Sequence, residues 1–222
     1  MTFDVIDNYQ DFCIQLRQAG FAIAADNDEG IFSLSSLFSN SIQWHTGDPQ
    51  TDPWAWRMRV LEEETDIGYG KLFFHKGGFM TREWAPYFLC AKRRHENYQQ
   101  IYQQGRLGYL EKSICQFVAQ EGEAALHEIK AAVGAKGMEA ALARLQTGMF
   151  LTICGQKQKL SKENVPYGWP ATTFQLTEAF WGKDVVKAAA AISVQEACDK
   201  IRERIYELNP AADKKAVERL LR

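Results

Sequence analysis

The 222-residue sequence has no excess of positive charge and no long hydrophobic run. It contains 26 Lys and Arg against 28 Asp and Glu, a formal net charge of −2. A protein whose main work is to coat nucleic acid usually has a basic balance, so the composition argues against that class while leaving local basic surfaces open. No apolar stretch approaches the length of a membrane span, and the N-terminus shows no signal peptide.

Paired cysteines and phosphate-binding glycines are also lacking. The five cysteines are scattered with no CxxC pair, which predicts free thiols in a reducing compartment, hence a cytoplasmic location, and neither a disulfide framework nor a zinc site. Gly68 and Gly70 do not make a phosphate loop, because no helix follows them directly and no GKS or GKT is present. The sequence predicts no cofactor.

Residues 1–105 predict an N-terminal region of helices and a hairpin. Apolar spacing predicts a first helix ended by Gly20, and "FAIA" predicts a short strand. Asp52 followed by Pro53 predicts the start of a second helix. The "HKGG" stretch predicts a hairpin whose glycines supply the positive φ of the turn. The expected helices run over 7–19, 54–64 and, as one continuous helix, from Thr81 or Pro86 to Gln104.

Residues 106–182 carry the clearest pattern. Apolar residues at helical spacing predict three successive helices, and the β-prone runs "MFLTIC" and "ATTFQL" flank a polar, basic stretch. Three helices followed by a two-stranded hairpin is the order of a winged helix-turn-helix. Residues 183–222 predict a helical tail, in which Ser193 with Glu196 predicts a capped helix start. The expected fold class is therefore α+β and mostly helical, with the N-terminal region as a candidate second, divergent winged-helix-like unit.

Basic side chains are the candidate contacts for DNA phosphates. Between Leu107 and Trp181 the chain carries seven basic and seven acidic residues, which makes this region a poor stand-alone grip on DNA. Its use as a packing or interaction unit is an equal alternative. The candidates are Lys136 and Arg144 on the third helix, Lys157, Lys159 and Lys162 on the hairpin, and Arg93 in "AKRRHE", a segment that more simply forms a solvated, ion-paired rim.

The stretch "SIQWHTGDPQTDPWAWRMRV" contains the candidate site. Trp54 falls at helical spacing with Met58 and Leu61, so it is most simply a core residue. Gln43, Trp44 and His45 precede the helix in a loop, where they suit either a cleft that stacks a planar ligand or a hydrogen-bonded anchor; the residues alone favour the anchor. A metal site formed by His45, Asp48 and Asp52 is disfavoured, because all three lie in one loop and Asp52 is better explained as a helix cap.

The same stretch resembles the N-terminal Gln-x-Gln segment of AlkZ-type winged-helix DNA glycosylases, in which Q-x-Q-D-P precedes an apolar helix ending in Arg. The segments "KGGFMTREWAPYFL", "ALARLQTGMFLTICGQKQKLSKENVPYGWPATTF" and "IYELNPAADKK" are similar to the smaller AlkZ-related bacterial proteins, and this similarity covers most of the chain. The resemblance implies catalytic roles at Gln43 and His45, although His45 stands where the glycosylases have their second glutamine. It also implies base stacking by Trp44 or Trp54 and duplex DNA as partner.

Three functional hypotheses follow from these observations. The first is a DNA-associated protein with N-glycosylase chemistry on alkylated bases. The second is a non-catalytic winged-helix module that binds nucleic acid or a protein. The third is a small-molecule binder that uses the tryptophan-rich cleft. The sequence decides neither the lesion nor the oligomeric state.

Overall fold

The computed structural model describes residues 2–161 and 163–222. About half of the residues are helical, and the strands form one six-stranded sheet in the order β1-β3-β2-β5-β6-β4. The expected α+β class is confirmed. The strands are β1 (Phe21–Ile23), β2 (Ile67–Phe73), β3 (Lys76–Thr81), β4 (Ala124–Ala125), β5 (Leu151–Leu160) and β6 (Pro166–Leu176). The helices are α1 (Tyr9–Ala19), α2 (Pro53–Glu63), α3 (Ala85–Arg93), α4 (Tyr98–Gln103), α5 (Tyr109–Glu121), α6 (Leu126–Val133), α7 (Met138–Thr147), α8 (Thr177–Trp181), α9 (Lys183–Ala191), α10 (Val194–Leu208) and α11 (Lys214–Leu220), with a 3₁₀ turn at Leu34–Leu37.

The antiparallel sheet contains strands from both sides of the expected boundary between the first two regions, at residue 105. β1, β3 and β2 form one half and β5, β6 and β4 the other, and the halves meet where Tyr69 pairs with Ile153. The side chain of Gln146 on α7 braces this junction, because its amide oxygen accepts from the backbone N–H of Lys71 at 2.9 Å. Gln146 is itself buried at this junction.

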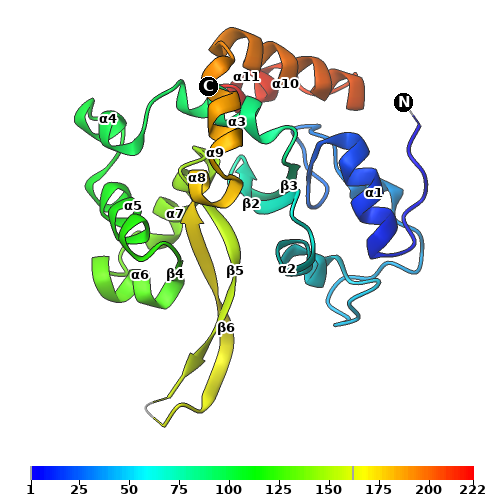
Figure 1. Ribbon diagram of the computed structural model, residues 1–222. Coiled ribbons are helices and arrows are strands. Elements are labelled where there is room, and N and C mark those ends of the chain that lie inside the picture. Colours follow the sequence, from blue (N-terminus) through cyan, green and yellow to red (C-terminus); the bar gives the residue numbers. More distant parts are fainter. Residues whose placement is uncertain (1, 162) are drawn as a thin grey trace.

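The two faces of the sheet carry two hydrophobic clusters, as the two-residue period of a strand requires. Ala22 and Phe79 pack with α1, α2 and the α5–α7 helices, whereas Phe21 and Met80 pack with α3 and α9–α11. Figure 1 shows these groups of helices around the sheet and the β5–β6 hairpin projecting from the body. The fold thus leaves the outer part of one hairpin exposed.

The helix that follows the candidate loop begins as expected but buries a different face. The Asp52 carboxylate accepts from Trp54 N at 2.8 Å, and Pro53 opens the helix. Trp56 and Val60 are fully buried, whereas Trp54 is 48% exposed. The expectation that Trp54 is a core residue is therefore wrong, because α2 packs through its 56/60 face.

The β2–β3 turn is built differently from the expected one. Phe74 and His75 adopt the positive φ angles, 50° and 64°, and Phe73 pairs with Lys76 around them. The glycines of "HKGG" lie in β3 instead. A Cβ on Gly78 would stand 2.5 Å from the Phe73 ring, so close packing, and not turn geometry, requires glycine there.

The expected continuous helix up to Gln104 is two helices. Arg94 and His95, with φ of 51° and 63°, end α3, and Asn97 and Gln100 form a capping box that starts α4. A helical period in the sequence does not reveal this break, because neither glycine nor proline marks it.

The three helices and the hairpin expected from residue 107 onward are present as α5, α6, α7 and β5–β6. The strands of the hairpin are longer than "MFLTIC" and "ATTFQL", since pairing continues from Leu151–Leu176 out to Leu160–Pro166. The polar stretch is thus mainly strand. In the tail, Ser193 caps α10 as expected, and Asp213 caps α11. Among the described residues, no helix has the length and hydrophobicity of a membrane span.

Candidate nucleic-acid interface

A buried carboxylate organises the loop that precedes α2. Asp52, 1% exposed, accepts from the backbone N–H groups of Trp54 (2.8 Å), His45 (2.9 Å) and Gly47 (2.9 Å). Burial alone would raise the pKa of Asp52, but the three donors outweigh it and hold the pKa below its usual value. One ionised side chain therefore fixes both the helix start and the backbone of the candidate loop.

The candidate catalytic side chains lie on this loop at the surface. Gln43, Trp44 and His45 are all exposed, with 38% of Trp44 accessible. The backbone N–H of Gln43 donates to Thr51 O at 3.1 Å, and His45 adopts a positive φ of 63°. The main chain of the loop is thus anchored through its own N–H groups. The Gln43 and His45 side chains, which the residues alone favoured as the anchor, are exposed instead.

An aromatic and cationic stack connects the loop with α2. The His45 ring centroid lies 4.8 Å from that of Trp54, and the guanidinium of Arg57 lies 3.2 Å from the Trp54 ring centroid. Arg57 also donates to Trp54 O at 2.8 Å. Guanidinium stacking holds the half-exposed indole in place, so this ring is preorganised for a further stacking contact.

A groove of about 580 Å³ runs between α2 and the hairpin. The α2 side presents Trp54 and Arg57, and the hairpin side presents Gln156 and Trp169. The remaining lining residues are Pro49, Gln50, Ala55, Met58, Arg59, Glu62, Glu63 and Pro170. The structure therefore brings Trp54 to a groove, while Gln43, Trp44 and His45 lie outside its lining.

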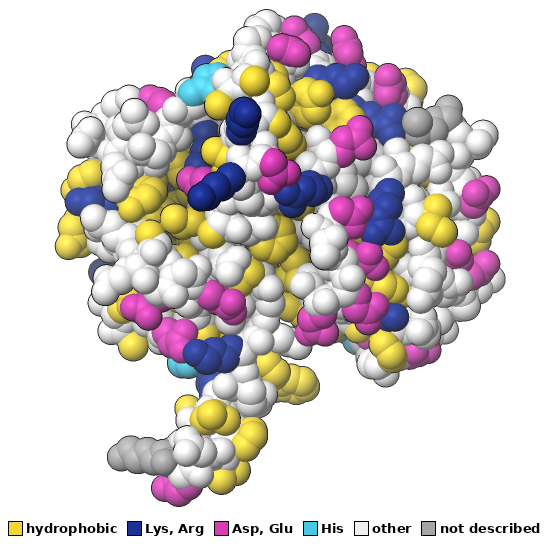
Figure 2. All heavy atoms as spheres, in the orientation of Figure 1, with side chains coloured by type: hydrophobic (Ala, Val, Ile, Leu, Met, Phe, Trp, Pro, Cys, Tyr) yellow, Lys and Arg dark blue, Asp and Glu magenta, His cyan; other side chains and the backbone are white. Residues whose placement is uncertain are grey.

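The projecting hairpin is unusually apolar for an exposed element. Trp169 is 89% exposed, and Leu160, Val165 and Tyr167 are each more than half exposed. Figure 2 shows hydrophobic side chains along this projection, with basic and acidic side chains intermixed over the rest of the visible face. A cluster of exposed apolar side chains on one element indicates an interaction surface.

Two exposed candidate DNA-binding cations take part in ion pairs. Arg144 Nε lies 2.8 Å from Oε1 of the buried Glu111, and Lys157 Nζ lies 2.7 Å from Glu128 Oε1. Arg144 and Lys157 nevertheless remain 56% and 58% exposed. Since an exposed pair is weak, Lys157 can exchange its partner for a phosphate at small cost.

Arg93 has a different environment from the other candidates. It is 7% exposed, donates to Met149 O at 2.9 Å, and forms a two-bond ion pair with Glu178 at 2.5 and 2.9 Å. Its guanidinium joins α3 to α8 inside the molecule and does not face solvent. Its neighbour Lys92 donates to Leu220 O.

The remaining basic candidates are Lys136, Lys159 and Lys162. Lys136 is exposed just before α7, and Lys159 lies on β5 opposite Tyr167. Lys162 lies outside the described residues. The described residues contain no group of three or more His, Cys, Asp or Glu side chains that could hold a metal ion.

The comparison with known proteins decides the family. Residues 6–222 match the model of a family described as AlkZ related. This chain belongs to the AlkZ-related family. No curated protein and no solved structure matches it. The family assignment agrees with the resemblance found in the sequence and covers the candidate loop, α2 and the hairpin together.

Three of the four groove side chains singled out above, Arg57, Gln156 and Trp169, were not site candidates in the sequence. Arg57 follows Trp54 by three residues, a spacing that places both on one helix surface, and this signal could have identified the stack. Gln156 could not have been found in this way, because its position opposite α2 depends on how the two halves of the sheet join.

Proposed function

We propose that this AlkZ-related chain binds duplex DNA and receives an unstacked base in the groove between α2 and the hairpin. The joint exposure of Trp54 and Trp169 along one groove carries this proposal. Stacking on an aromatic side chain contributes about 1–3 kcal/mol per base, and the Arg57 guanidinium already fixes the Trp54 ring. Family membership supports DNA as the partner.

The proposed contact with the duplex is made by the hairpin more than by α7. We interpret α5–α6–α7 and β5–β6 as a winged helix in which Gln146 ties the last turn of α7 to β2. Lys136 lies at the other, exposed end of α7. Lys157 and Lys159 on β5, with Lys162 in the same segment of the sequence, supply the phosphate contacts, and the apolar side chains of the hairpin approach the base pairs.

The proposed chemistry is hydrolysis of the N-glycosidic bond of an alkylated base. The Gln43 amide positions a water molecule and His45 accepts its proton. The water oxygen bonds to the sugar carbon as the bond to the base breaks, and the base leaves with the electron pair. The proton accepted by His45 then passes to the departing base or to solvent. Neutral His45 suits this role, because an imidazolium would oppose an oxocarbenium-like transition state. The exposed loop must close on bound DNA to exclude bulk water.

The experiment measures binding and base release together, on alkylated and undamaged duplexes at two salt concentrations. Trp169→Ala is expected to weaken binding about tenfold, the loss of one stacking contact. Tyr109→Ala, which removes an aromatic side chain that is 73% exposed on α5, is the matched control and should bind like the wild type. Gln43→Ala should abolish base release without affecting binding. Equal binding by both aromatic variants would exclude the groove.

A non-catalytic DNA-binding protein is the second candidate. One observation favours it: Gln43 and His45 lie outside the lining of the groove. In that case binding is salt-dependent and independent of the lesion, and no base is released from any duplex. The same assay separates the two functions.

A further inference from the structure

A second cavity lies at the point where the expected long helix breaks. It has a volume of about 250 Å³ and is lined by α3, the α3–α4 connection, α4, α8 and α9. Arg94 and His95, two consecutive non-glycine residues at positive φ, form this connection. Left-handed backbone at such residues is costly and is often retained where a binding site requires it. This cavity shares no lining residue with the α2–hairpin groove.

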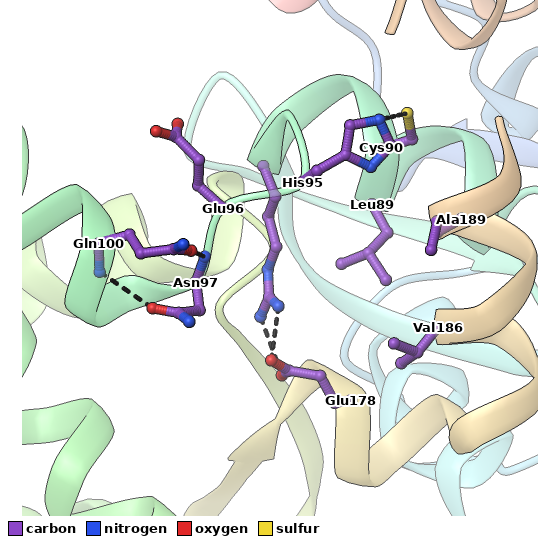
Figure 3. Close-up of a pocket in the computed structure, with 11 residues that line it drawn as sticks. Leu89, Cys90, His95, Glu96, Asn97, Gln100, Glu178, Val186 and Ala189 are labelled. Carbon is purple, nitrogen blue, oxygen red and sulfur yellow. Dashed lines mark hydrogen bonds and ion pairs between the residues drawn. The ribbon is translucent and has the colours of Figure 1, made fainter. Parts of the chain in front are cut away.

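The walls of the cavity differ in chemistry. Figure 3 shows Leu89, Val186 and Ala189 on one side and the amide side chains of Asn97 and Gln100 on the other. The apolar wall suits the face of a flat ring, whereas the amides suit its polar edge. A ligand with one apolar face and a hydrogen-bonding edge matches this arrangement.

Hydrogen-bonding capacity remains on the polar side. The side-chain oxygens of Asn97 and Gln100 accept from each other's backbone N–H groups at 2.9 and 2.8 Å. Among the described residues neither amide nitrogen has an acceptor, so both keep N–H donors. An ionised carboxylate offers about four acceptor positions, and Arg93 occupies two of those of Glu178. The cavity therefore presents donors and an acceptor together.

The charged side chains around the cavity are paired with each other or with neighbours, which disfavours a strongly ionic ligand. The positive charge of Arg93 is balanced by Glu178, and Glu96 pairs with Arg106. Figure 3 shows the His95 ring turned toward Cys90, whose sulfur lies 3.8 Å from His95 Nε2. With its charges paired, the site favours a neutral ligand. Its volume is below the ~300–1,000 Å³ of pockets for drug-sized molecules, so the ligand has one or two rings.

We infer that this cavity binds a free, neutral nucleobase-sized heterocycle, with the ring against Leu89 and Val186 and its polar edge against Asn97, Gln100 and Glu178. Adjacent donors and acceptors on the edge of a planar ring are the features that distinguish nucleobases from purely apolar aromatics. The inference does not depend on the proposed DNA function, because the cavity and the groove are built from different residues.

The test is calorimetric titration of the full chain with adenine, and with indole as a flat bicyclic compound that lacks the acceptor edge. Adenine is expected to bind with a dissociation constant of about 0.1–1 mM, in keeping with its small size. Indole should bind at least about tenfold more weakly. No adenine binding at several millimolar, or equal binding of the two compounds, would overturn the inference.

Two substitutions on α9 locate the site. Ala190 lines the cavity and is exposed, so Ala190→Phe fills its mouth without disturbing the core. Ala188 is exposed on the same helix but does not line the cavity, which makes Ala188→Phe the matched control. The first variant should lose adenine binding and the second should keep it. Equal adenine binding by both variants would refute this location.

The proposed DNA binding and the inferred adenine binding can be refuted separately. Ala190→Phe should leave DNA binding unchanged, and Trp169→Ala should leave adenine binding unchanged. Loss of adenine binding in Trp169→Ala would place the free base in the groove and refute the cavity as its site.

Discussion

Removal of the Asp52 carboxylate is expected to destabilise the protein and release the candidate loop. Loss of an N-cap costs about 1 kcal/mol, and each of the other two hydrogen bonds to this charged acceptor contributes about 1.5 kcal/mol. Asp52→Ala should therefore lower the free energy of unfolding by about 4 kcal/mol, or by about 2 kcal/mol if water replaces the lost acceptor. Urea unfolding measures the change.

The local effect distinguishes this role from a general loss of stability. Amide hydrogen exchange should accelerate at His45 and Gly47, whose N–H groups lose their acceptor, and much less in β5. Asp48→Ala is the matched control, because Asp48 is exposed in the same loop and accepts only from Gln50 N and Thr51 Oγ1. A free energy of unfolding within about 0.5 kcal/mol of the wild type for Asp52→Ala would refute the reasoning, since surface substitutions already reach that size.

The same carboxylate gives a pH dependence with a definite sign. Because folding lowers the pKa of Asp52 below its usual value of 3.8, its contribution is present above that pH and is lost as the pH falls through 3.8 toward the folded pKa. The difference in stability between wild type and Asp52→Ala should therefore shrink on acidification. A difference that grows at low pH would contradict the assignment.

Three further outcomes concern individual charged side chains. Glu178→Gln leaves the buried Arg93 without its counter-charge and should cost about 3 kcal/mol in thermal or urea unfolding, and a cost below about 1 kcal/mol would mean that Arg93 finds water. Burial lowers the pKa of Lys92 to about 8 from 10.5. Between these pH values the unfolded chain binds the extra proton, so the stability of the wild type relative to Lys92→Met should increase as the pH rises. A difference in stability that does not change with pH would argue against the burial of Lys92. Lys157→Ala should leave the melting temperature unchanged but lower the salt dependence of DNA binding by about one counterion, and an unchanged slope would remove Lys157 from the interface.

The sequence predicted the parts of the fold that depend on local signals. Asp52 with Pro53, Gly20 after α1 and Ser193 before α10 mark helix ends through hydrogen bonds within a few residues, and the structure has all three. The end of α3 at Arg94 and His95 carries no such signal, whereas Asn97 and Gln100 mark the start of α4 locally. The break borders a cavity formed with α8 and α9, elements far along the chain.

The candidate site was predictable only in part, for a related reason. The anchored loop follows from Asp52, a neighbour in sequence. The ion pairs of Arg93 and Arg144 do not follow from neighbouring residues, because their partners Glu178 and Glu111 lie 85 and 33 residues away. The sequence did not predict that α2 packs through Trp56 and Val60. This face and the face with Trp54, Met58 and Leu61 both fit a helical period, and only the surrounding core decides between them.

The contacts between α10 and the first helix have a consequence for how the chain folds during synthesis. Arg204 donates to Ala19 O across 185 residues, and Asn209 donates to Gly30 O across 179. The cluster on the Phe21 face contains side chains as far along the chain as Leu221. Because these pairings join segments so distant in sequence, the apolar face of β1 and β3 is covered only in part, by α3, until α9–α11 have emerged from the ribosome. A nascent chain stalled before α10 should therefore expose part of this apolar face and be a substrate for chaperones.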